Sequence, residues 1–297
     1  MRRRSKLMLA GFGVVVLGLA AIWNPFVRIS LERATVVVPP AAQVVPVPGH
    51  DDVLAVVYSG DGGWADLDRQ LGGAFAAHGL PVLGINAFKY YWRLRSGEES
   101  AAQLDALLTE NLARWHKQRI WLVGYSFGAD VLPSIIDRLG PENRGRIAQL
   151  VLLSPSRDYS YEIKFEGYMI ARGRFLAFAK RLLEKFSKVP DYPALPPVQA
   201  LRDQFPVVCY YGKDDADDSL CTMPDLPSWV EVHAKNGDHH FDGGYVPLAA
   251  QMLAELPSRA GPVPVPATHP GPTSPPAASS APGAAPAVAT TVVHGRP

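Results

Sequence analysis

A short apolar run that ends in a tight glycine–serine–glycine turn constrains this chain more than any other feature. Residues 120–133 read IWLVGYSFGADVLP, so a β-rich segment leads directly into GYSFG at 124–128, and a helix-like segment follows. Such a turn leaves no room for side chains at its two glycines, and it holds the serine in strained, exposed geometry. An ordinary glycine-rich turn is the alternative interpretation. The strand before the motif and the helix after it favour Ser126 as a nucleophile.

The two ends of the chain differ in composition from its body. Residues 1–6 are mostly cationic and residues 7–23 form an uninterrupted apolar run, so residues 1–23 are predicted to be a signal peptide or an N-terminal membrane anchor. Either one would place the body, residues 24–257, in the periplasm, possibly still tethered to the inner membrane. Residues 258–297 are rich in proline and alanine and predict a disordered tail. A net charge of +1 argues against a nucleic-acid partner.

Within the body, β-rich apolar runs alternate with segments of helical periodicity. This alternation predicts an α/β fold in which helices cover both faces of a mostly parallel sheet. The segment at about 155–197 is too long for a simple connection, and we interpret it as a lid inserted at the carboxyl ends of the strands. The expected strands are 52–58, 80–86, 119–123, 147–153, 205–211 and 229–233, and the expected helices are 67–78, 99–115, 129–139 and 246–256.

A nucleophilic serine needs a base and a carboxylate that orients the base. In the α/β-hydrolase fold these follow in the order serine, acid, histidine, each at the carboxyl end of a strand. The run GKDDADD at 212–218 follows the expected strand 205–211. Its spacing favours Asp215 as the acid, with Asp214 and Asp217 as alternatives; a solvated acidic turn is the non-catalytic interpretation.

The histidine is expected after the last strand, where residues 237–244 read GDHHFDGG. We favour His240 over His239 as the base, because a His-Phe pair after a glycine turn is the usual form of this loop. A paired histidine motif could also bind a metal, but no third ligand with supportive spacing is evident in the sequence, so no metal and no cofactor are predicted.

Cys209 and Cys221 flank the acidic run. In an exported chain this pair suggests a disulfide that would hold the acid loop in one shape, although two separate buried thiols are the alternative. An oxyanion hole needs two backbone N–H donors, one from the residue after the nucleophile and one from the loop after an early strand. We expect these donors at Phe127 and, within SGDGG at 59–63, at Asp61.

With these residues in place, the chain resembles the VirJ/AcvB family of bacterial virulence proteins, which are exported α/β-hydrolases. The resemblance supports Ser126, the acidic loop and the paired histidines as the catalytic set, although the acidic run departs from the Glu-rich form of the family. The segments that carry the resemblance are YSGDGGW (58–64), KYYW (89–92), GYSFGADVLP (124–133), SPS and FE (154–156 and 165–166), CYYG with its acidic run (209–221) and GDHHFDGGY (237–245).

The resemblance implies two activities. AcvB-like members hydrolyse lysyl-phosphatidylglycerol, an aminoacyl ester that needs no cofactor, whereas VirJ-like members are linked to virulence and type IV secretion. A periplasmic partner of secretion-system proteins and a generic lipase, esterase or thioesterase therefore remain alternatives. A cationic lysyl group would suit the aspartates around the expected site. A membrane surface is the further expected partner, since the insertion holds a basic amphipathic stretch with Arg172, Arg174, Lys180, Arg181, Lys185 and Lys188.

Overall fold

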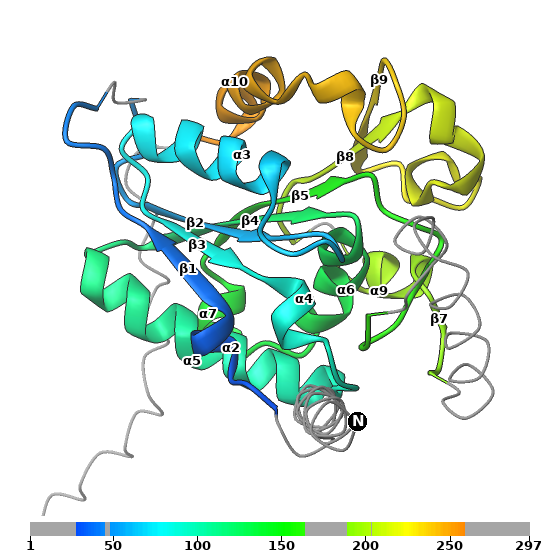
Figure 1. Cartoon of the computed structure of the whole chain (residues 1–297), viewed down its shortest axis with the longest axis horizontal. Helices are drawn as coiled ribbons and strands as arrows, with labels where there is room; N and C mark the ends of the chain where they lie inside the picture. The colour runs from blue at the N-terminus through cyan, green and yellow to red at the C-terminus, as the bar shows by residue number, and fades with distance from the viewer. Residues whose placement is uncertain (1–27, 45–47, 164–188, 203, 259–297) are drawn as a thin grey trace, which may run out of the picture. The chain divides into compact units, whose positions relative to one another are not determined.

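A seven-stranded sheet forms the centre of the domain (Figure 1). The structure is a computed structural model that describes residues 28–44, 48–163, 189–202 and 204–258. The strands of the sheet are β1 (Thr35–Val38), β2 (Val53–Tyr58), β3 (Val82–Ile85), β4 (Arg119–Tyr125), β5 (Ile147–Leu153), β8 (Val207–Gly212) and β9 (Val230–Lys235). Their order is β1-β3-β2-β4-β5-β8-β9; β1 is antiparallel to β3, and all other neighbours are parallel. The predicted, mostly parallel α/β sheet is confirmed.

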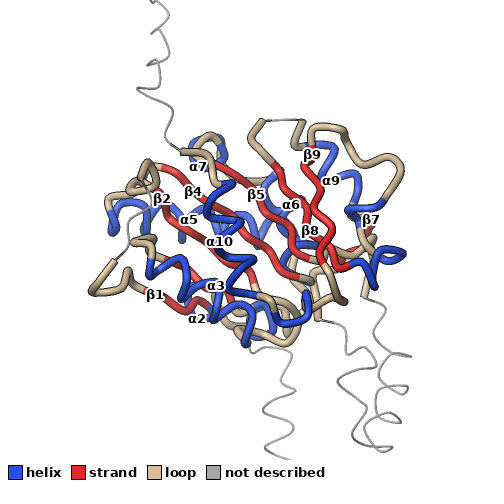
Figure 2. Tube along the Cα trace, turned by 90° about the horizontal axis from the view of Figure 1, so that it is seen from above, coloured by secondary structure: helices blue, strands red, loops and turns tan. Residues whose placement is uncertain are grey.

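Helices cover both faces of this sheet, α3 and α10 side by side on one face and α5 and α6 on the other (Figures 1 and 2). The helices are α2 (Leu31–Ala34), α3 (Asp66–Ala77), α4 (Ala87–Tyr90), α5 (Gly97–Trp115), α6 (Phe127–Ile136), α7 (Pro141–Arg144), α9 (Leu195–Ala200) and α10 (Tyr245–Glu255). Leu54 and Val56 of β2 belong to the core on the α5 and α6 face. Val53 and Ala55 belong to the core on the α3 and α10 face. Burial on both faces explains why this strand is an uninterrupted apolar run.

The edge strand β1 is not among the strands expected from the sequence. Thr35–Val38 is only four residues long and is followed by two prolines. It pairs antiparallel with Val82–Ile85, so it does not follow the strand–helix alternation that predicted the other strands. Its pairing partner lies more than forty residues further along the chain. This strand is therefore defined by a tertiary contact rather than by a local pattern.

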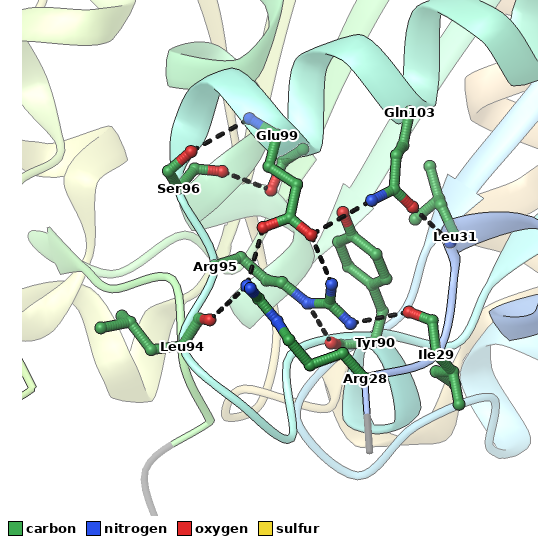
Figure 3. Close-up of polar contacts among 10 residues, drawn as sticks. Arg28, Ile29, Leu31, Tyr90, Leu94, Arg95, Ser96, Glu99 and Gln103 are labelled. Atoms are coloured by element: carbon green, nitrogen blue, oxygen red, sulfur yellow. Dashed lines mark hydrogen bonds and ion pairs between the residues drawn. The ribbon is translucent and has the colours of Figure 1, made fainter. Parts of the chain in front are cut away.

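The first described residues are joined to the start of α5 by hydrogen bonds (Figure 3). Arg28 donates hydrogen bonds to the Leu94 carbonyl, at 2.6 Å, and to the Glu99 carboxylate, at 2.7 Å. The buried Arg95 donates to the same carboxylate and to the Ile29 carbonyl, at 2.6 Å. Two guanidinium groups thus share one carboxylate in charge-assisted hydrogen bonds. The chain that leads into α2 and β1 is held in place by this network.

The insertion begins and ends in a small antiparallel pair. β6 (Asp158–Tyr159) pairs with β7 (Tyr192–Pro193), and α9 follows β7 directly. These short strands bring the two ends of the insertion together, next to α6. The expected basic amphipathic stretch falls within residues 164–188, which lie outside the described residues.

The expected leader, residues 1–23, and nearly all of the expected tail, residues 258–297, also lie outside the described residues. Every described residue belongs to one compact unit, which lies within Met1–Arg259. Among the described residues, no helix combines the length and apolar character that crossing a membrane requires.

Candidate active site

Ser126 occupies the sharp turn between β4 and α6. Its backbone has φ 51° and ψ −120°, a conformation that side-chain-bearing residues rarely adopt. A Cβ atom added at Gly124 would lie 2.6 Å from the backbone of Ala129, and one at Gly128 would lie 2.5 Å from the carbonyl oxygen of Tyr58. Both flanking positions must therefore be glycine for the helix to start so close to the sheet. The serine is held strained and partly exposed, as the motif predicts.

The acid loop follows β8 and is closed by a disulfide. Cys209 and Cys221 are bonded, with their Cα atoms 5.7 Å apart, so the predicted disulfide is confirmed. It encloses η2 (Lys213–Asp218), in which Asp215 lies, and reaches η3 (Leu220–Thr222). In the chain-entropy model a loop of this length stabilises the fold by about 2–3 kcal/mol. The disulfide limits the movement of the loop that carries Asp215.

The histidine loop connects β9 to α10 and contacts the acid loop through the backbone. Asp214 N–H donates to the Gly237 carbonyl at 3.1 Å. A Cβ atom at Gly212 would lie 2.1 Å from the Asp238 carbonyl oxygen, so the two loops touch where β8 ends. Gly237 itself has φ +86°, which a residue with a side chain would adopt only under strain. These contacts bring the two loops together at the carboxyl ends of adjacent parallel strands.

The structure pairs Asp215 with His239, whereas the sequence analysis paired it with His240. Nδ1 of His239 lies 3.6 Å from Oδ2 of Asp215, and both side chains are about one-third exposed. His240 is turned elsewhere, and its Nδ1 lies 2.8 Å from the hydroxyl of Tyr125. Residues 238–240 form a tight turn, in which the backbone N–H of His240 donates to the Asp238 carboxylate at 2.8 Å. Because of this turn, the two successive imidazoles point in different directions.

Burial lowers the pKa of His239 below its ordinary value of 6.5. The Asp215 carboxylate raises this pKa, and Asp61 and Asp238 raise it more weakly. The neighbouring His240 lowers it further. The imidazole is therefore neutral at pH 7, as a general base must be. The 3.6 Å between Nδ1 of His239 and Oδ2 of Asp215 is longer than a hydrogen bond, and catalytic hydrogen bonds are often long when no substrate is bound.

The glycine-rich loop after β2 passes directly beside the serine. A Cβ atom at Gly60 would lie 3.4 Å from Cβ of Ser126 and 3.2 Å from the ring of Tyr125. The loop then turns sharply, with the Gly63 N–H donating to the Gly60 carbonyl at 3.0 Å. Asp61 sits inside this turn, and Phe127 is the first residue of α6. Both residues expected to provide oxyanion donors are thus on backbone segments next to Ser126.

A segment that the sequence analysis did not assign to the site, residues 154–156, contacts three of its parts. Ser154 has φ 48°, and its hydroxyl donates to the His239 carbonyl at 3.1 Å. The Ser156 N–H donates to the Asp130 carboxylate, one turn after Ser126, at 2.6 Å. The carbonyl of Pro155 accepts a hydrogen bond from the backbone N–H of Leu220, next to Cys221, at 3.0 Å. This segment therefore positions α6, the histidine loop and the acid loop relative to one another. SPS was the only sequence signal for it.

Asp130 should make the stability of the protein depend on pH. Burial raises the pKa of this carboxyl from 3.8 to about 8, although the hydrogen bonds from Ser156 lower it. The folded state therefore binds a proton that the unfolded state releases, and this group's contribution to stability is lost as the pH rises from about 4 through about 8. We expect Asp130→Asn, which does not titrate, to gain free energy of unfolding relative to wild type between pH 5 and pH 9, by on the order of 2–5 kcal/mol.

Urea denaturation of both proteins at the two pH values measures this difference. Asp225→Asn, which changes an exposed carboxylate, is the matched control and should follow the wild-type pH dependence. If the stability difference between Asp130→Asn and wild type is the same at both pH values, the carboxyl does not stay protonated in the folded state.

The α/β-hydrolase fold class is defined here by parallel strands, by a strained serine after the central strand β4, and by candidate acid and histidine loops after β8 and β9. The family to which the chain belongs is that of the bacterial virulence protein VirJ, because the model of this family matches residues 52–260, well over half of the chain. The resemblance inferred from the sequence is thereby confirmed. Fold, family and site support a hydrolase.

Several solved structures are similar to the chain at low sequence identity. The proline iminopeptidase of Mycobacterium smegmatis is 12% identical with a TM-score of 0.49, over 74% of this chain and 93% of that one. Est1E from Butyrivibrio proteoclasticus is 11% identical with a TM-score of 0.48, over 74% and 93% of the two chains. MenH from S. aureus is 12% identical with a TM-score of 0.48, over 74% and 97%. None of the curated proteins matches the chain.

Proposed function

We propose that the protein is a serine hydrolase that transfers the acyl group of a carboxylic ester to water. The observation that carries this proposal is the contact between Asp215 and His239. The His239 ring lies 5.5 Å from the ring of Tyr125, which directly precedes the strained Ser126. Ser126 is the proposed nucleophile, His239 the base and Asp215 the group that orients the base. The choice of His239 replaces the earlier preference for His240, because the tertiary structure pairs Asp215 with His239.

In the proposed reaction, the Ser126 hydroxyl attacks the ester carbonyl while His239 accepts its proton. The backbone N–H groups of Phe127 and Asp61 stabilise the oxyanion of the tetrahedral intermediate. The intermediate then collapses, the ester C–O bond breaks, and His239 protonates the departing alkoxide; the alcohol leaves and the acyl group stays on Ser126 as an acyl-enzyme. Water, deprotonated by the same imidazole, attacks the acyl-enzyme and releases the carboxylic acid, and Ser126 regains its proton. Neither a metal nor a cofactor takes part in these steps.

The proposed substrate is lysyl-phosphatidylglycerol, whose lysyl group is joined to the lipid through an ester. Such an aminoacyl group carries two ammonium charges at neutral pH. Asp61 and Asp238 are close enough to His239 to raise its pKa, so their negative charge acts where the reaction is proposed to occur. Asp214, Asp217 and Asp218 add exposed carboxylates on the acid loop. This negative potential would attract a cationic acyl group and disfavour an anionic one.

The proposed location is the periplasm, at the surface of the membrane that holds the lipid. The disulfide between Cys209 and Cys221 is compatible with an exported protein, because such bonds persist in oxidising compartments. The basic and then apolar sequence of residues 1–23 supports the proposed export. Anchoring to the inner membrane by this segment is part of the proposal. The basic stretch of the insertion motivates docking on anionic lipid.

Membership in the VirJ family supports a second candidate, a periplasmic factor for type IV secretion and virulence that does not depend on hydrolysis. A fluorophosphonate probe separates this candidate from the first. A hydrolase should label at Ser126 and should lose the label in Ser126→Ala. A folded wild-type protein that does not label would favour the secretion role.

The substrate proposal is tested with the full-length protein and vesicles that contain lysyl-phosphatidylglycerol. We expect free lysine to appear in proportion to enzyme, as measured by mass spectrometry, and phosphatidylglycerol to accumulate. Vesicles in which a neutral fatty-acyl ester replaces the lysyl lipid are the control. Hydrolysis of the control lipid alone would support a generic lipase or esterase and would exclude the aminoacyl ester as substrate.

A further inference from the structure

A histidine and two glutamates converge at the edge of the sheet, on residues that the proposed reaction does not use. Glu231 and His233 lie on the same face of β9, and Glu255 lies in the last turn of α10. Nε2 of His233 is 3.0 Å from Oε1 of Glu231 and 3.4 Å from Oε1 of Glu255. One donor atom from each residue falls within 4.8 Å of the other two. Two carboxylate oxygens and an imidazole nitrogen thus form a compact donor set.

The two separations from His233 match those between ligands of a bound transition metal. Zinc binds histidine nitrogen and carboxylate oxygen at about 2.0–2.2 Å with tetrahedral angles, which places neighbouring ligand atoms about 3.3 Å apart. The two distances from His233, 3.0 and 3.4 Å, lie on either side of that value. A mixed imidazole and carboxylate set suits zinc better than the all-oxygen shells of magnesium or calcium.

The environment of Nε2 of His233 indicates that a ligand binds between these three side chains. Nε2 of His233 is inaccessible to solvent and has no hydrogen-bond partner among the described residues. Both carboxylate oxygens are within reach of this nitrogen, but neither is aligned to form a hydrogen bond with it. A buried polar atom without a hydrogen bond is costly, and a metal ion in front of its lone pair would satisfy it.

The surrounding residues hold the donors as a metal site requires. The amide of Gln251 donates to Oε1 of Glu255 at 2.6 Å, and the hydroxyl of Tyr210 donates to the other oxygen of this carboxylate. The Tyr210 ring stacks on His233 with a centroid distance of 4.9 Å, because the two residues are partners in the sheet. Such outer contacts orient ligands and tune their affinity.

We propose that Glu231, His233 and Glu255 bind one zinc ion that joins β9 to α10. The Glu231 side chain is 60% exposed, so the ion can enter from solvent, and water can fill a fourth position. The loop that carries His239 and His240 follows β9 and leads into α10. The ion would hold the last turn of α10 against β9, a structural role that is independent of the proposed hydrolysis.

The test uses the full-length protein, freed of metal with a chelator and dialysed. Titration calorimetry with zinc chloride should give one site per chain, and zinc should raise the Tm of the wild type. Glu231→Gln, which changes an exposed side chain, should weaken this binding at least about tenfold, and His233→Gln should abolish the one-to-one site. Glu110→Gln, an exposed glutamate on α5, is the matched control and should bind as the wild type does.

Absence of a one-to-one site in the wild type would overturn the proposal. Equal zinc affinity in the wild type, Glu231→Gln and His233→Gln would overturn it as well, because the ion would then bind elsewhere. Circular dichroism shows whether each variant is folded, and the exposed Glu231 keeps the test valid if His233→Gln is unstable. Since binding and Tm are measured without substrate, the outcome does not depend on the proposed hydrolase activity.

Discussion

Replacing Ser126 by alanine is expected to lower kcat for ester hydrolysis by roughly 10⁴–10⁶-fold. The reason is that the covalent step requires an oxygen nucleophile in the turn between β4 and α6, and alanine offers none. The oxyanion donors and the substrate contacts remain, so KM should change much less than kcat. Release of the carboxylic acid from an activated ester, followed at saturating substrate, measures the effect.

Two further variants make this result specific. Ser228→Ala removes an exposed serine outside the site and should retain full activity. Ser126→Gly should be as inactive as Ser126→Ala but more stable than the wild type by roughly 1 kcal/mol, because glycine adopts the backbone conformation of this turn without strain. Hydrolysis by folded Ser126→Ala at more than about one-tenth of the wild-type rate would rule out Ser126 as the nucleophile.

Replacing His239 by alanine is expected to lower kcat by roughly 10³–10⁴-fold, whereas His240→Ala should retain activity within about tenfold of wild type. The difference follows from the contacts of the two imidazoles, since Asp215 lies beside His239 and Tyr125 beside His240. The two variants are natural controls for each other, because they remove the same group from adjacent positions. The reverse order of activities would identify His240 as the base.

The pH dependence of kcat/KM gives an independent measurement on the same residue. The proposed base is active when neutral, and burial lowers the pKa of His239 below 6.5. Activity should therefore persist at pH values below 6.5 and decline only as the imidazole is protonated. The Asp215 carboxylate raises this pKa, so Asp215→Asn should move the acidic limb to still lower pH while it lowers the maximal rate. An acidic limb above pH 7 in the wild type would contradict this assignment.

The central strands and the serine turn were predictable because their signals are local. The run 52–58 is apolar throughout, since a parallel strand is buried on both faces, and the structure has the strand at Val53–Tyr58. The serine turn was predictable because its glycines are required by clashes with nearby backbone atoms. The disulfide was predictable because two cysteines flank one short loop in a chain whose residues 1–23 predict export.

Other features depend on contacts between residues that are distant in the sequence. The strand Thr35–Val38 forms because it pairs with β3, and no local pattern in the sequence predicts that pairing. The roles of Ser154 and Asp130 arise where three loops meet, so single residues in the sequence could not reveal them. The cluster around His233 likewise needs β9 and α10 to be packed together before its donors converge.

The sequence by itself determined the alternation of the main strands and helices, the serine turn and the loops from which an acid and a base could come. These follow from periodicity and steric limits that act over a few neighbouring residues. Only the tertiary structure decided which of two adjacent histidines meets Asp215. That choice depends on how one tight turn directs successive side chains, and on the contacts by which the neighbouring loop holds that turn in place.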